Sequence, residues 1–228
     1  MKHTEKELQA LKEEVSQMWR LVLSQLEKAK QSFLNADIEM AREIASREKR
    51  VDAFELKIDS DCENYIALYS PVAIDLRLVL SLIKISSTLE RIGDFAEGIA
   101  RHVIDDDCNK IAPLLFEELQ MEKMFDVLIS MLSDSYVALE SENTKLSGKI
   151  LAKDNEIDIL YFNSVEILTT ALEKNVSLIR CGLKLMLLIR KLERIGDHCS
   201  NIVEEIVFYV DAKVLKHGSK KNNKADYS

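Results

Sequence analysis

The chain has 228 residues, of which 47% are hydrophobic and 31% are charged, and its formal net charge is −8 at pH 7. This acidic balance argues against a nucleic-acid-binding protein, which would need a basic surface. Only six glycines and two prolines interrupt the sequence, and no apolar run approaches the roughly 18 residues of a membrane span. We therefore expect an all-α protein, and the polar N-terminus without a hydrophobic signal region favours the cytoplasm.

Apolar residues recur at steps of three or four through most of the chain, which is the pattern of amphipathic helices. Asp37 precedes the second helix as a candidate N-cap, and Ser70 and Pro71 are placed to cap and open the third. Pro113 opens the fourth helix and Asn143 caps the fifth. The pattern predicts six long helices, over residues 5–35, 38–68, 71–105, 113–137, 143–174 and 176–210.

The hexapeptide Leu-Glu-Arg-Ile-Gly-Asp occurs twice, at residues 89–94 and 192–197. An offset of 103 aligns the two copies, and an offset of 106 aligns Asp52 with Asp158 on the preceding helices. The change of offset requires only a shorter link before the sixth helix. The chain is therefore predicted to be an internal duplication of a three-helix unit.

The duplication predicts two three-helix bundles placed end to end, because short connections make neighbouring helices antiparallel. The acidic stretch that begins at Asp105 indicates the boundary between them. We expect a first repeat over residues 1–107, a second over residues 108–212, and a disordered basic tail over residues 213–228.

Each hexapeptide places a Glu and an Asp four residues apart, so that two like charges repel each other on one helix face. A matching acidic pair with the same spacing precedes each hexapeptide on the neighbouring helix. From their positions around the helix, the hexapeptide carboxylates are predicted to point outward, roughly 140–180° away from the side of the helix that faces the core. The eight acidic residues are Glu48, Asp52, Glu90, Asp94, Asp154, Asp158, Glu193 and Asp197.

Four acidic pairs in equivalent places favour a bound divalent or trivalent cation, although a solvated acidic surface is the simpler explanation of any single pair. Oxygen ligands suit Mg²⁺, Ca²⁺, Mn²⁺ or iron better than a structural zinc. Gly93 and Gly196 lie in mid-helix, where each costs about 1 kcal/mol relative to alanine. Such glycines are expected either to seat the neighbouring helix or to leave room beside the carboxylates.

These residues resemble the PhoU family of phosphate-uptake regulators over about residues 5–212. The resemblance rests on the duplicated unit, on the segment from Pro71 to Arg77, and on both hexapeptides, of which the second continues as His198 to Ile202. It implies a cytosolic, non-catalytic regulator that represses the phosphate-starvation response. Such a regulator links the ATPase subunit of a phosphate ABC transporter to a membrane sensor histidine kinase.

The resemblance also implies homodimers that reach the membrane only through these partners, and multinuclear metal clusters of iron or zinc at the eight acidic positions. The two copies differ, because Phe95 and Gly98 stand where the second copy has His198 and Asn201. This difference predicts that the second metal site is the more complete one.

Three other functions fit parts of the sequence. A ferritin-like di-iron enzyme would need inward-facing Glu-x-x-His pairs, and the sequence contains none. A helical adaptor without metal would use the acidic surfaces to bind basic partners. A PhoU-like accessory protein could also serve another phosphate or sodium/phosphate transporter, and the sequence does not separate this case from the main prediction.

Overall fold

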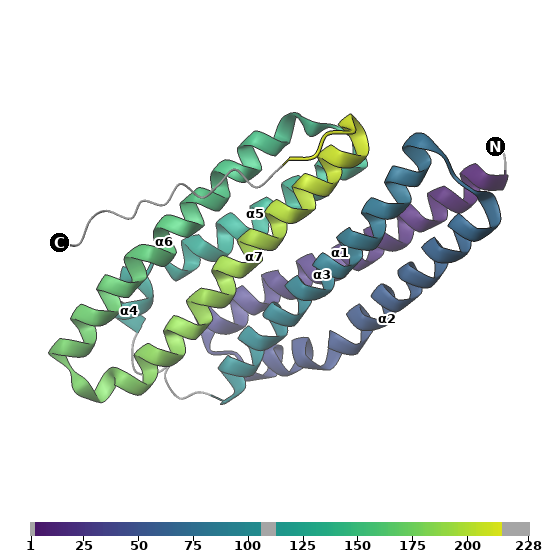
Figure 1. The fold of residues 1–228 in the computed structure, drawn as a ribbon. Coiled ribbons are helices and arrows are strands. Elements are labelled where there is room, and N and C mark those ends of the chain that lie inside the picture. Colours follow the sequence, from purple (N-terminus) through teal and green to yellow (C-terminus); the bar gives the residue numbers. More distant parts are fainter. Residues whose placement is uncertain (1–2, 106–112, 216–228) are drawn as a thin grey trace.

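The computed structural model describes residues 3–105 and 113–215, and within these ranges the chain is helical and contains no strand (Figure 1). The all-α prediction is therefore confirmed. The α-helices of the described residues are α1 (His3–Asn35), α2 (Ile38–Tyr69), α3 (Ala73–Asp105), α4 (Pro113–Glu118), α5 (Met121–Glu140), α6 (Ser147–Lys174) and α7 (Ile179–Asp211). Single 3₁₀ turns, Thr144–Leu146 and Val176–Leu178, precede α6 and α7. Most of the predicted tail, residues 216–228, lies outside the described ranges.

The helices form two three-helix bundles, α1–α3 and α5–α7, and the short α4 packs beside α5. The bundles lie side by side along their length, with α3 against α7 and α1 against α5 (Figure 1). The predicted end-to-end arrangement is therefore wrong. The reason is that α1, α3 and α7 carry buried residues around more than one face, so that each of these helices needs neighbours in both bundles. Among the described residues, no helix is apolar enough over a sufficient length to cross a membrane.

The helix boundaries differ from the prediction at two places. Ser70 adopts a left-handed conformation (φ 45°) and ends α2, its N–H donating to the Ile66 carbonyl, so that α3 begins at Ala73 instead of Pro71. The predicted fourth helix is divided into α4 and α5 by Gln120, which is also left-handed (φ 51°). The division places α4 where Phe116 packs on Phe33 of α1, with ring centroids 4.9 Å apart.

The duplication is visible in the packing around the two hexapeptide glycines. Added Cβ atoms at these glycines would meet side chains in equivalent places, namely Val51 and Gln25 at Gly93, and Ile157 and Leu128 at Gly196. These neighbours correspond to each other under the two offsets that align the sequence halves. The two bundles therefore share one packing scheme, and each brings its hexapeptide against the helix that carries the preceding acidic pair.

Candidate metal centre

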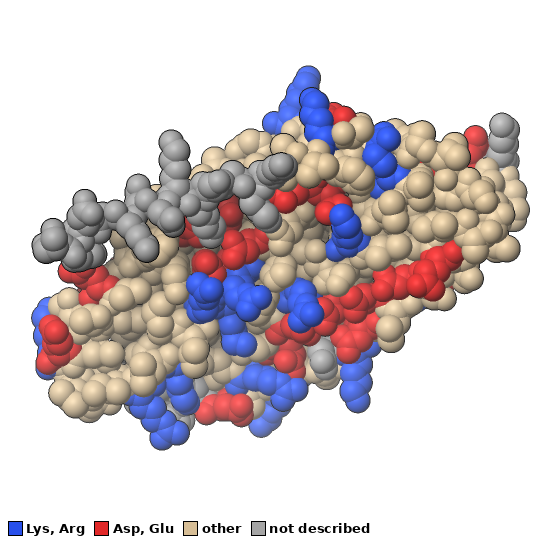
Figure 2. Space-filling view, in the orientation of Figure 1, with Lys and Arg blue, Asp and Glu red and all other residues tan. Residues whose placement is uncertain are grey.

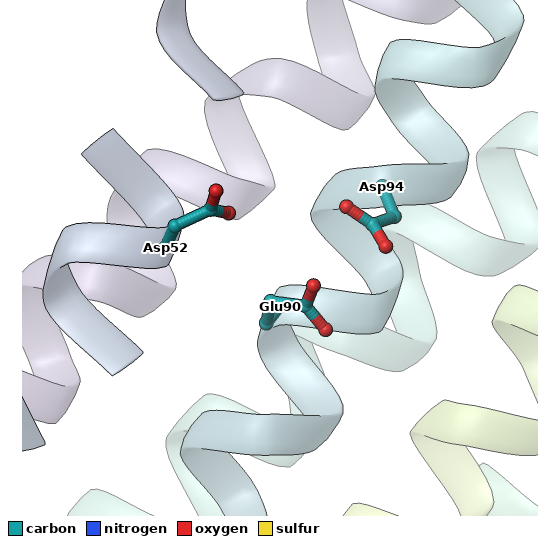
Figure 3. Close-up of side chains that lie close together, drawn as sticks. All are labelled: Asp52, Glu90 and Asp94. Atoms are coloured by element: carbon teal, nitrogen blue, oxygen red, sulfur yellow. The ribbon is translucent and has the colours of Figure 1, made fainter. Parts of the chain in front are cut away.

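Asp52, Glu90 and Asp94 bring three carboxylates together between α2 and α3 (Figure 3). One carboxylate oxygen of each residue lies within 4.8 Å of the others, and all three side chains are half-buried. Glu90 and Asp94 share a face of α3 because they are four residues apart, and Asp52 reaches them from α2. The structure thus gathers three of the four acidic residues predicted for the first half. The fourth, Glu48, lies on α2, but its side chain is outside the described part of the molecule.

The surroundings of Glu90 in this group disfavour the ionised form of its carboxyl. Burial, together with the negative charges of Asp94 and Glu55, raises the pKa of Glu90 from 4.5 to about 7. Arg91 opposes the shift, with its Nε 3.7 Å from the Glu90 carboxylate. Near neutral pH, this group therefore favours uptake of either a proton or a cation.

A cation fits the donor set of this site. The donors are carboxylate oxygens only, which are the ligands of Mg²⁺, Ca²⁺, Mn²⁺ and iron, whereas a structural zinc prefers Cys and His. The surrounding surface is also acidic, since Asp and Glu form a stripe along α2 and α3 (Figure 2). Glu55 contributes to this field and was missed from the sequence, although it lies three residues after Asp52 on the same helix.

The second half arranges its acidic residues differently. Among the described residues, Asp154, Asp158, Glu193 and Asp197 do not bring three carboxylate oxygens as close together as the first site does. Glu193 is only 6% exposed, and Nη1 of Arg190 lies 3.4 Å from its Oε1. The prediction that Glu193 faces outward is therefore wrong. The structure gathers carboxylates most closely in the first half, whereas the sequence favoured the second.

The two hexapeptide glycines have different roles, and each of the two predicted roles is found once. A Cβ at Gly93 would stand 3.2 Å from Cγ1 of Val51, so this glycine seats the neighbouring helix α2. A Cβ at Gly196 would stand 2.8 Å from Oδ1 of Asp154, so this glycine leaves room for a carboxylate.

Comparison with known proteins gives the family of this fold. The family model described as PhoU domain matches residues 15–103 and 121–206. The chain belongs to the PhoU family. It is 33% identical over 211 residues to the phosphate-specific transport system accessory protein PhoU of Edwardsiella tarda, which covers 92% of this chain and 86% of that protein.

Two solved structures of the family have the same fold. The crystal structure of PhoU from Pseudomonas aeruginosa matches with a TM-score of 0.85 and 27% identity, covering 92% of this chain and 99% of that one. The crystal structure of the phosphate transport system regulatory protein PhoU from Streptococcus pneumoniae matches with a TM-score of 0.81 and 29% identity, covering 94% of this chain and 100% of that one.

The two hexapeptide helices of this PhoU-family chain meet each other along the α3–α7 seam. Phe95 and His198 occupy equivalent positions after the two hexapeptides, and their rings are 5.6 Å apart. The guanidinium group of Arg194 also lies over the Phe95 ring, with its Cζ 5.3 Å from the ring centroid. His198 therefore packs on an aromatic ring between the halves, and burial lowers its pKa. The seam has an approximate two-fold relation centred near these two rings.

Proposed function

We propose that this chain is a PhoU-type regulator that represses the phosphate-starvation response in the cytoplasm. It would link the ATPase subunit of a phosphate ABC transporter to a membrane sensor histidine kinase, without a catalytic step of its own. It would act as a homodimer and reach the membrane through these partners. The observation that carries the proposal is membership of a family whose relatives are named as accessory and regulatory proteins of phosphate transport.

The proposal includes binding of divalent or trivalent metal ions by the acidic residues of both halves. In the first half, Glu48, Asp52, Glu90 and Asp94 are the proposed ligands, and the raised pKa of Glu90 supports this assignment. A bound cation would supply positive charge that offsets the repulsion among the carboxylates. The proposed ligands of the second half are Asp154, Asp158, Glu193 and Asp197.

We propose repeat domains over residues 1–107 and 108–212, followed by a tail over residues 213–228. The two segments matched by the family model fall one in each proposed repeat. The side-by-side packing of α3 on α7 indicates that the repeats act as one body.

The ligand assignment is tested by elemental analysis of protein purified without chelators. We expect a Glu90→Ala/Asp94→Ala variant to lose the metal of the first half, because removal of two of the gathered carboxylates leaves too few oxygen ligands. A Glu193→Ala/Asp197→Ala variant should lose the metal of the second half. The control is Glu166→Ala on the exposed face of α6. Metal content equal to that of wild type in both double variants would refute the assignment.

The regulatory role is tested by deletion of the gene in its native host. Phosphate-starvation genes are expected to be expressed in phosphate-rich medium, because the repressing link to the kinase is lost. Restoring the wild-type gene should restore repression. An unchanged phosphate response would favour an accessory protein of another phosphate or sodium/phosphate transporter. Restored repression by a variant that holds no metal would favour a metal-free adaptor.

A further inference from the structure

A cavity of about 240 Å³ lies between the C-terminal end of α3 and the N-terminal part of α7. Its volume is below the range of about 300–1,000 Å³ that is usual for pockets of drug-sized ligands, which indicates a small ligand. Two leucines of α7 form its apolar wall, and one of them, Leu187, is 67% exposed at the rim. Among the residues that the structure describes, the charged lining residues are Arg101, Lys184, Lys191 and Asp105.

Lys191 is the central cation of this cavity. Its side chain crosses from α7 to α3 and lies on Gly98, where a Cβ atom would collide with the Lys191 ammonium group. Within residues 3–105 and 113–215, Lys191 forms no ion pair. Arg101 pairs through Nε with Glu97 on its own helix, which leaves the other guanidinium N–H groups as donors. The cavity therefore presents Lys and Arg donors from two helices.

The approximate two-fold relation of the seam provides an internal comparison for this cavity. The offset of 103 relates each lining position on one helix to a position at the opposite end of the seam. The residues equivalent to Gly98, Arg101, Lys184 and Lys191 are, in this order, Asn201, Glu204, Ser81 and Thr88. The opposite end thus has no lysine at the position of Lys191 and an acidic residue at the position of Arg101.

The opposite end of the seam is closed by its own hydrogen bonds. Ser81 Oγ donates to the Glu205 carbonyl at 3.2 Å, and Lys84 Nζ lies 2.9 Å from the Glu205 carboxylate. The same two helices therefore pack together without the Gly98–Lys191 contact. The cationic cavity is an addition at one end of the seam, and packing of the helices does not account for it.

We propose that this cavity binds a compact oxyanion of the phosphate class, either inorganic phosphate or pyrophosphate, through Lys191, Lys184 and Arg101. Lys and Arg N–H groups donate strong charge-assisted hydrogen bonds to phosphate oxygens. The apolar wall strengthens these interactions by lowering the local dielectric constant. The bound anion would contact α3 and α7 together and would therefore stabilise the packing of the two bundles. The proposal does not depend on the carboxylate site.

The test is calorimetric titration of the full chain with inorganic phosphate and with pyrophosphate. Bound metal is first removed with a chelator that is then dialysed away, so that no cation at the carboxylates can recruit the anion. We expect binding that weakens with added salt. Lys191→Thr and Arg101→Gln should each weaken the affinity by about tenfold or more, since each removes a charge-assisted contact. The matched control is Lys84→Thr at the opposite end, which should keep the wild-type affinity.

The outcomes separate this proposal from the metal proposal. The anion proposal would be overturned if the wild-type protein bound neither phosphate nor pyrophosphate. It would also be overturned if both Lys191→Thr and Arg101→Gln kept the wild-type affinity, or if Lys84→Thr lost as much affinity as they did. Glu90→Ala/Asp94→Ala should lose metal but retain anion affinity. Threonine already stands at the equivalent position of the opposite end, so Lys191→Thr is expected to fold. If thermal unfolding shows that Lys191→Thr is not folded, the affinity of Arg101→Gln tests the proposal instead, because Arg101 is exposed and its substitution should not disturb the fold.

Discussion

Replacement of Trp19 by alanine should lower the free energy of unfolding by about 3–5 kcal/mol, the usual cost of truncating a buried tryptophan. Trp19 lies on α1, is only 1% exposed, and packs on Tyr136 of α5 with ring centroids 5.6 Å apart. Its Nε1 donates to the Leu132 carbonyl at 3.1 Å. The substitution therefore opens a cavity between the two bundles and removes a hydrogen bond that joins them.

Urea denaturation followed by helical circular dichroism measures this effect. The control is Trp19→Phe, which keeps a ring but loses the hydrogen bond and some volume, and should cost about 1–2 kcal/mol. If the bundles depend on each other, the alanine variant should still unfold in one transition. A cost below about 0.5 kcal/mol for the alanine variant would contradict tight packing between α1 and α5.

In metal-free protein, Glu90→Gln should raise the free energy of unfolding at pH 8 by about 1–2 kcal/mol. A pKa of about 7 lies above that of an unfolded glutamate, which is about 4.3. The folded state therefore holds more protons than the unfolded state between these values, and wild type loses stability as the pH rises from about 4 to 7. The full shift corresponds to about 3.7 kcal/mol, which solvent around this partly exposed carboxyl reduces.

Burial is the largest cause of the raised pKa of Glu90, and the negatively charged groups that face it add to the effect. Asp94 on α3 and Glu55 on α2 raise its pKa, and Arg91 lowers it by less. Glutamine removes the charge at nearly the same volume, so the variant should lack the part of the pH dependence that Glu90 contributes. At pH 4 the two proteins should have nearly equal stability.

Chemical denaturation at pH 4, 6 and 8 measures the difference, with Glu166→Gln on the exposed face of α6 as the control. Added Mn²⁺ should stabilise wild type more than Glu90→Gln, because the ion binds the folded state through a carboxylate that the variant lacks. A variant less stable than metal-free wild type at pH 8 would contradict the repulsion that we assign to Glu90. If Mn²⁺ stabilised both proteins equally, the ion would not be bound by Glu90.

The helices could be predicted from the sequence because their signals are local. Asp37 caps α2 as predicted, with its Oδ1 accepting from the Met40 N–H at 3.0 Å. Asn143 was predicted to cap the fifth long helix directly, but its side chain accepts from the Lys145 N–H and caps the 3₁₀ turn that precedes α6. The division at Gln120 could not be predicted, because neither glycine nor proline marks it. The left-handed backbone at Gln120 accompanies the packing of α4, which depends on contacts distant in sequence.

The candidate site was predictable as a set of residues but not as a geometry. Spacing by four residues placed Glu90 and Asp94 on one face, and the duplication linked them to Asp52 on α2. The duplication predicted an equivalent site in each half, and the presence of His198 and Asn201 after the second hexapeptide led us to prefer the second site. The burial of Glu193 beside Arg190 depends on how α7 rotates between its neighbours, which a single-helix pattern does not contain.

The all-α class, the duplicated unit and the acidic pairs could all be recognised in the sequence, since periodicity and repetition are properties of the chain. The packing of the helices was needed to show that the bundles lie side by side and that three carboxylates meet in the first half. It was also needed to show that Lys191 lies over Gly98 in a cavity that the opposite end of the seam does not repeat. The physical reason is that these features arise where helices from different parts of the chain meet, and their rotation and register are fixed by the packing of whole faces.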